Sequence, residues 1–368
     1  MDSAYARLLG TNGVIDPSQV KIVLPANSVL FDSPTVDKFV SDAKATTAVA
    51  IPLIHVRHLA ESAPASELMN EFLLRVILDH VHISVSSAQV KILSAADDDM
   101  LQISGFAPVN LYNRTADAKD ISHHLVTIWR NYARFFQPPA DPLCALSWNY
   151  LCMIMCAPVE QLELALGRRG PQCAPRALAA IETWSKSSAA RRAALHGAQV
   201  FYILSSGVYL PLSPVENKLL RVESMVFTSA LVLGLYLFTQ GTSLSSSTLV
   251  GNGNTPAALE LLQEIDWTSI NGEGFADEGY DWMVPFDNSG PPSSQSTGVQ
   301  VRQFIRHGEL LLSFDGESQS QGAKTASKIF QEYAYILDRL CGSSRSGSDL
   351  AKLARSVSDV LTSCEMGS

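Results

Sequence analysis

Apolar residues recur at intervals of three and four positions along most of the 368-residue chain, the period of an amphipathic α-helix. Residues 67–85 follow this spacing after Ser66, a plausible N-cap, and residues 121–136 follow it until Pro138 and Pro139 end the helix. The same pattern predicts further helices at 143–156, 159–166, 175–185, 189–204, 222–238, 256–265 and 322–340.

Strand-like patterning is sparse. The runs compatible with short β-strands are 21–24, 88–93 and 310–314, and the segments rich in Ser, Gly or Pro, which predict linkers or loops, are 241–248, 288–298 and 343–349. We therefore expect an all-α fold, a multi-helix orthogonal bundle with a loop-rich C-terminal third and at most short β-hairpins. The expected division is a helical domain at 1–240 and a loop-rich helical part at 241–368 packed on it.

The helix expected at 222–238 has no polar face, so it belongs either in a protein core or in a membrane. Its most apolar part, residues 225–238, would span about 21 Å as a helix, which is less than the roughly 30 Å of a hydrocarbon layer. The sequence therefore favours a buried core helix with Leu233 at its centre. We expect Gly234 to admit a neighbouring helix, and Thr228 or Ser229 to bond back to the preceding turn.

The composition and charge of the chain limit the classes of function that it can have. Hydrophobic residues make up 46% of the chain and charged residues 17%, which is enough apolar material for a large core. The 27 Lys and Arg against 36 Asp and Glu give a net charge of −9, and the densest basic spots are the pairs Arg168–Arg169 and Arg191–Arg192. Because DNA affinity depends on many cations that neutralise phosphates, we expect no direct binding to nucleic acid.

The six cysteines contain no C-x-x-C pair and no zinc-finger spacing, which predicts neither a structural zinc site nor a disulfide framework. The N-terminus lacks the basic and then apolar pattern of a secretory signal. We expect a soluble protein in a reducing compartment, without a membrane segment.

Histidines and cysteines are the first candidates for chemistry. The histidine pairs are His55 with His58, His80 with His82, and His123 with His124. Pairs at i, i+1 or i, i+2 do not share a helix face, and no carboxylate completes a ligand set for His55 and His58. Cys152 and Cys156 lie one helical turn apart with two methionines between them, which favours core packing over a nucleophile.

Glycine-rich and acidic segments give weaker signals. Residues 251–254 and 271–274 lack the preceding strand of a dinucleotide-binding loop, and the sequence contains no phosphate-binding loop or nucleophile elbow. The acidic groups at 97–99 and at 277–281 are typical of solvated loops. We therefore assign no catalytic, cofactor-binding or metal-binding residue. The small-residue face Ala189, Ala193, Gly197 and Ala198 predicts close packing of two helices.

Four stretches carry a family resemblance: 148–153, 162–171, 184–199 and 227–238. They contain the sequences WNYLCM, LELALGRRGP, AARRAALHGAQ and FTSALVLGLYLF, and together they resemble the fungal-specific transcription factor domain, the regulatory middle region of filamentous-fungal zinc-finger regulators. The resemblance extends over about residues 20–341, and it implies a helical regulatory domain, a nuclear location and a role in controlling genes.

Members of that family carry a zinc-finger DNA-binding module ahead of this region, and these 368 residues contain none. Three interpretations follow: a regulator whose upstream zinc-finger exon is missing, a co-regulator without fingers, or a domain recruited to another task, including catalysis. We expect a non-enzymatic regulator of a fungal secondary-metabolite gene cluster that acts through protein partners, either a DNA-binding regulator or a second copy of itself. The alternative is an enzyme or small-molecule binder on the same scaffold, acting on an apolar polyketide or terpenoid intermediate.

Overall fold

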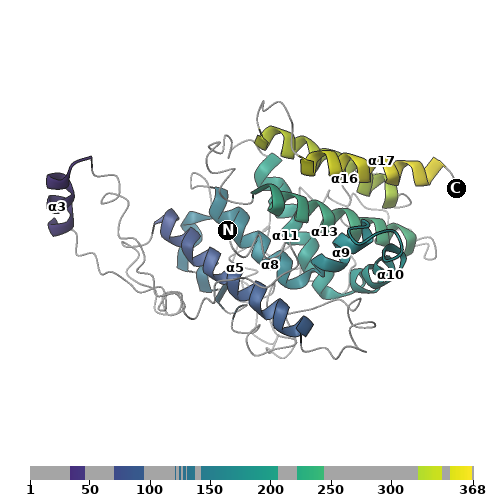
Figure 1. The fold of residues 1–368 in the computed structure, drawn as a ribbon, viewed down its shortest axis with the longest axis horizontal. Coiled ribbons are helices and arrows are strands. Elements are labelled where there is room, and N and C mark those ends of the chain that lie inside the picture. Colours follow the sequence, from purple (N-terminus) through teal and green to yellow (C-terminus); the bar gives the residue numbers. More distant parts are fainter. Residues whose placement is uncertain are drawn as a thin grey trace, which may run out of the picture.

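The computed structural model describes residues 34–45, 70–94, 121, 124, 125, 127–129, 131–136, 142–205, 222–243, 322–341 and 349–366. Within these residues nearly every position is helical and none is in a β-strand, which confirms the expected all-α fold. The helices are α3 (Val36–Ala45), α5 (Glu71–Ser94), α8 (Pro142–Cys156), α9 (Val159–Ala165), α10 (Ala174–Ser185), α11 (Ser188–Ser205), α13 (Val222–Ser243), α16 (Gly322–Cys341) and α17 (Asp349–Met366), with a short 3-10 turn at Ala133–Phe135. Figure 1 shows α5 to α17 gathered in one bundle, with α3 apart from it.

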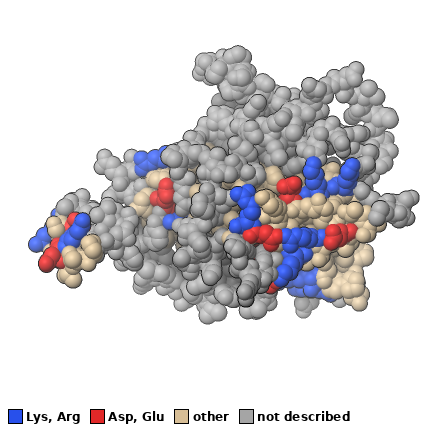
Figure 2. All heavy atoms as spheres, turned by 90° about the horizontal axis from the view of Figure 1, so that it is seen from above, with Lys and Arg blue, Asp and Glu red and all other residues tan. Residues whose placement is uncertain are grey.

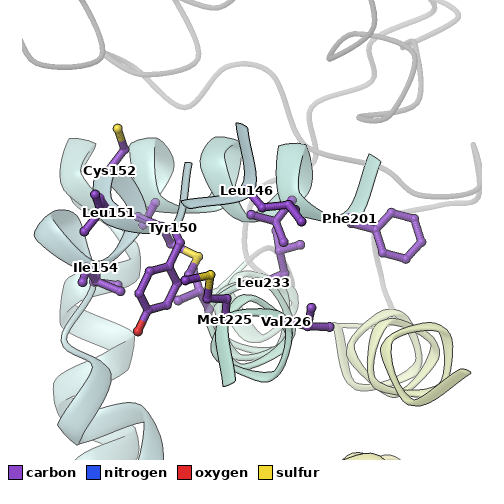
Figure 3. Packing of buried hydrophobic residues seen from close by; sticks show 14 of the residues in the cluster. Leu146, Tyr150, Leu151, Cys152, Ile154, Phe201, Met225, Val226 and Leu233 are labelled. Atoms are coloured by element: carbon purple, nitrogen blue, oxygen red, sulfur yellow. The ribbon is translucent and has the colours of Figure 1, made fainter. Parts of the chain in front are cut away.

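Two helices form the centre of the bundle because they are apolar on all sides. In α8, every residue from Leu143 to Cys156 except Ser147 is buried. In α13, every side chain from Met225 to Leu237 is buried, and the ring of Phe330 covers Gly234. Side chains of both helices point into one apolar layer, with Leu146 and Tyr150 from α8 and Val226 and Leu233 from α13 (Figure 3). Helices α9, α10, α11, α16 and α17 also contact α13.

Helix α13 is longer than the sequence predicted, and it is a core helix as expected. The helix has 22 residues, so it is about 33 Å long, and its segment Val222–Thr239 is long and apolar enough to cross a membrane. Most of that segment, 83%, is buried inside the bundle, and Leu233 is 0% exposed. Burial among neighbouring helices, and not shortness, is therefore what identifies α13 as a core helix.

The 80° angle between α8 and α9 has a local cause. Pro158 follows Cys156 and Ala157 and occupies the N-cap position of α9, because a proline cannot continue the hydrogen-bond ladder of α8. The other end of α9 closes on Gly167, which has a φ of +85°. The Gly167 N–H donates to the Leu164 carbonyl at 2.9 Å and the Arg168 N–H donates to the Glu163 carbonyl at 3.2 Å, the pairing of a Schellman C-cap.

The start and end of α5 differ from the prediction. The helix begins after Asn70, whose Oδ1 accepts the Leu73 N–H at 2.8 Å, and not after Ser66. The strand expected at 88–93 is wrong, because α5 continues through these residues to Ser94. Val85 and Ala88 extend its buried face, and the Gln89 amide donates to the Ile154 carbonyl of α8 at 3.2 Å. Packing along α8 outweighs the local β-propensity of a short run.

The remaining helices compare with the sequence as follows. Helices α8, α9, α10, α11 and α16 begin and end within one residue of the predicted bounds, whereas α13 continues to Ser243, into the predicted linker. Helices α3 and α17 were not predicted. The segments expected as a helix at 256–265 and as strands at 21–24 and 310–314 lie outside the described residues, and the two-part domain division stays a prediction.

Candidate functional site

Helix α11 carries buried polar groups that bond to α8, α13 and α16. His196 is 2% exposed, and its Nδ1 lies 3.0 Å from Oδ1 of Asn149 on α8. The Asn149 amide nitrogen donates to the Ala145 carbonyl at 2.9 Å, so Oδ1 is left as the acceptor and the His196 Nδ1 donates. Burial, and then the charge of Arg192, lower the pKa of His196 to about 3. The imidazole is therefore neutral at physiological pH.

One residue further along α11, the Gly197 carbonyl joins three helices. Its oxygen lies 2.9 Å from Ser229 Oγ of α13 and 3.0 Å from the Tyr333 hydroxyl of α16, and these two hydroxyls are 2.6 Å apart. Two hydroxyl protons serve three close oxygen pairs, so one hydroxyl donates to the carbonyl and the other donates to its neighbour. This cluster of Gly197, Ser229 and Tyr333 is called the hydroxyl triangle below. Burial raises the pKa of Tyr333, which keeps its hydroxyl protonated.

Glycine at position 197 permits this close approach. A Cβ at that position would lie 3.2 Å from Leu233 Cγ, 3.4 Å from Ser229 Oγ and 3.5 Å from Met153 Sδ. Ala189, Ala193 and Ala198 are buried as well. The predicted small-residue face is therefore confirmed as the face on which α11 packs closely. The prediction for Ser229 was wrong in detail, because its hydroxyl bonds to α11 and α16 instead of the preceding turn of its own helix.

Both basic pairs singled out in the sequence are engaged within the protein. Arg191 and Arg192 are buried at 9% and 6% exposure, and Arg191 donates to the Lys186 carbonyl at 2.9 Å. Arg169 forms an ion pair with Glu160 at 3.2 Å, and Arg168 forms one with Glu163. Figure 2 shows one face of the molecule, seen from above the view of Figure 1, where the acidic and basic side chains of the described residues are interspersed. Neither arginine pair is arranged as a phosphate-binding patch.

The buried cysteines lack the properties of nucleophiles. Cys152 and Cys156 are 0% and 1% exposed. Burial raises the pKa of Cys152 well above its usual range, and it raises that of Cys156 to about 11 even though Arg192 acts in the opposite direction. Because the thiolate is the reactive form, both residues fill core space, as the sequence indicated.

The other candidates are placed as follows. His82 is buried and its ring makes a T-shaped contact with that of Tyr150, and His124 is also buried. In the part of the chain that the structure describes, no three His, Cys, Asp or Glu side chains form a group that could hold a metal ion. His55, His58 and His123, and the segments 97–99, 251–254, 271–274 and 277–281, lie outside the described residues. The expectation that the chain has no metal site stays a prediction.

The side-chain types around α11 are those of many active sites, but here they are buried. His196, Ser229 and Tyr333 are between 0% and 2% exposed, so they do not line an open site in this structure. A histidine with a pKa near 3 is also a weak base at neutral pH. These groups form hydrogen bonds with one another and with the backbone, and the bonds align α8, α11, α13 and α16.

Comparison with known proteins adds no assignment. No protein-family model matches the chain, and neither the curated proteins nor the solved structures contain a significant match. The resemblance to the fungal regulatory domain therefore stays a prediction.

Sequence reasoning missed Asn149 and Tyr333. Asn149 sits in the apolar run of α8, where a single amide predicts a buried hydrogen bond, and that signal was available. Tyr333 lies on the apolar face of α16, where its spacing looks like ordinary core, and its partner Gly197 is 136 residues away.

Helix α3 presents exposed apolar side chains. Its N–H groups are capped by Thr35, whose Oγ1 accepts the Lys38 N–H at 3.3 Å. Val36, Phe39 and Val40 are 77%, 47% and 42% exposed, and they share one face because they lie at positions i, i+3 and i+4. The helix does not pack along any other described helix (Figure 1).

Proposed function

We propose that this chain is a non-enzymatic regulatory protein that acts by binding protein partners, in the manner of the regulatory domain of fungal transcription factors. The exposed apolar face of α3 carries the proposal. An amphipathic helix that presents anchors at i, i+3 and i+4 suits the groove of a partner protein, and ten residues are too few for a helix to be stable in water without contacts.

The burial of the potentially reactive side chains in the bundle supports the same function. The histidine, serine, tyrosine and cysteines described above are buried and hydrogen-bonded or have raised pKa values, which disfavours catalysis at these positions. The net charge of −9 and the engagement of both arginine pairs disfavour direct contact with DNA. Under this proposal the chain reaches its genes, a metabolite cluster in a fungal nucleus, through a DNA-binding partner.

The test is a tethering assay in a filamentous fungus. The full chain is fused to an unrelated DNA-binding domain, and transcription of a reporter with the matching sites is measured, together with nuclear accumulation of the fusion. We expect the parent chain to change reporter output several-fold. Val40→Asp, which places a charge on the apolar face of α3, should return the output to background.

Ser41→Asp is the matched control, since it introduces the same charge at the neighbouring exposed position on the polar face of α3. It should behave as the parent. An unchanged reporter with the parent fusion would contradict the regulatory role, and equal effects of the two substitutions would contradict the role of the α3 face. Saturable binding of an apolar small molecule with turnover to a product would instead favour the enzyme alternative.

A further inference from the structure

Helix α17 carries two adjacent rows of small or apolar side chains, and one row faces the rest of the bundle. The inward row is Ala351, Ala354, Ser358 and Leu361, all between 0% and 8% exposed. Its small residues bring α17 close to α16, where Ser358 Oγ donates to the Ser327 carbonyl at 3.1 Å. Arg355 forms an ion pair with Asp338 of α16 at the outer edge of this contact. These contacts hold α17 along one edge of the bundle (Figure 1).

The second row lies one position earlier in each case and is here called the α17 seam. It consists of Leu350, Leu353, Val357 and Val360, whose spacing of three, four and three is that of the a and d positions of a coiled coil. Leu350 and Val357 are partly buried at the edge of the core, whereas Leu353 and Val360 are 44% and 61% exposed. The seam therefore continues the apolar core of the bundle outward to the surface.

The surroundings of the seam fit a second copy of the same helix. The flanking positions on the open side are Asp349, Ser356 and Ser363, all exposed; the two serines are small and uncharged and permit close approach, and Asp349 pairs with Lys352 of its own helix at 2.8 Å. Lys352 and Asp359 precede the two exposed apolar residues, and both are exposed. In an antiparallel pair with Leu353 opposite Val360, each Lys352 lies at nearly the same height as Asp359 of the other copy.

We propose that the chain self-associates through the α17 seam as an antiparallel, two-fold symmetric helix pair. The arrangement is isologous, because the same residues serve both copies. A seam of two heptads is at the small end of specific interfaces, so the dimer forms at micromolar or higher concentrations. The proposal is independent of the regulatory role proposed above, because it concerns a different helix and is tested on purified protein.

Sedimentation velocity of the full chain, from micromolar to several hundred micromolar, tests the association. We expect a concentration-dependent monomer–dimer equilibrium that Val360→Asp weakens at least about tenfold, which corresponds to about 1.4 kcal/mol. Gln331→Asp, an exposed substitution on α16 outside the seam, is the matched control and should leave the equilibrium unchanged. Circular dichroism confirms that each variant keeps its helix content. A strictly monomeric parent, or a dimer insensitive to Val360→Asp, would overturn the proposal.

Two further measurements test the direction of pairing. Asp359→Lys alone should weaken the dimer, because it places two cations opposite each other, and adding Lys352→Asp to it should restore the dimer. Under oxidation, a mixture of Leu353→Cys and Val360→Cys chains should form the mixed crosslink. Predominant crosslinking of Leu353→Cys chains to each other would show a parallel pair and contradict the antiparallel arrangement.

Discussion

Replacing Gly234 by alanine tests how closely α13 and α16 are packed. A Cβ at position 234 would lie 2.4 Å from Cε2 and 2.8 Å from Cζ of Phe330, distances at which one of the two groups must move. Phe330 is 0% exposed and lies inside the main core, so its ring has no solvent-filled space to enter. Gly234→Ala therefore forces either the ring or the whole of α16 outward.

Whether Gly234→Ala raises or lowers the free energy of unfolding distinguishes helix propensity from overpacking. In the interior of an exposed helix, Gly→Ala stabilises by about 1 kcal/mol because alanine has the higher helix propensity. Overpacking a core costs about 1–3 kcal/mol, and contacts shorter than 3.0 Å place this site in the upper half of that range. The expected net result is a loss of about 1–2 kcal/mol in the free energy of unfolding, opposite in sign to the propensity effect.

Urea denaturation followed by circular dichroism measures this loss for the parent, Gly234→Ala, Phe330→Leu and the double variant. We expect the double variant to lose less free energy of unfolding than the two single variants lose together, by about 1 kcal/mol or more. The reason is that the smaller side chain at position 330 makes room for the added methyl group. Gly197→Ala is the comparison, since its Cβ would meet Leu233 Cγ at 3.2 Å and should cost less. A stabilised Gly234→Ala variant, or strictly additive single effects, would refute the close packing of α13 on α16.

Four other predictions concern the core, pH, DNA and metal. Leu233→Asp places an unpaired carboxylate at a position that is 0% exposed, which costs several kcal/mol against a typical stability of about 5–15 kcal/mol. The variant should therefore be insoluble, or unfolded by circular dichroism. Leu353→Asp, at an exposed position, is the control and should stay folded. A cooperative melt of Leu233→Asp near the parent temperature would show that α13 is peripheral. The pKa of His196 is lowered from 6.5 to about 3 in the folded state, so the unfolded state binds the extra proton between these values. Stability should fall as pH falls below about 6.5, by up to about 1.4 kcal/mol per pH unit from this group, and His196→Gln should remove that part of the slope in urea titrations at several pH values. The purified chain should bind duplex DNA no more tightly than the non-specific level of about 10⁻⁴ M at physiological salt, and micromolar, sequence-selective shifts would contradict this expectation. Elemental analysis should find far less than one zinc per chain, whereas stoichiometric zinc that resists chelators would reveal a site assembled from distant segments.

The sequence alone determined the helical class and most of the central helices. Helices α10, α11 and α16 are periodic, α8 is a continuous apolar run, and signals such as Pro142 and Pro175 mark where helices begin, so local information suffices for them. It missed α17, although Leu350, Leu353, Val357 and Val360 recur at intervals of three and four residues and that signal was available in the sequence. It failed at 88–93 because a short run has no intrinsic preference strong enough to outweigh packing on α8.

Only the tertiary structure decided how the polar groups are used. Ser229 and Tyr333 are 104 residues apart in the chain, and both meet the Gly197 carbonyl because three helices converge there. Their burial, like that of His196, follows from helices folding over one another, and no local pattern contains that information. The same holds for α13, whose composition and length suit a membrane as well as a core. Its neighbours on every side make it a core helix, because hydrophobic burial depends on what surrounds a helix and not on the helix alone.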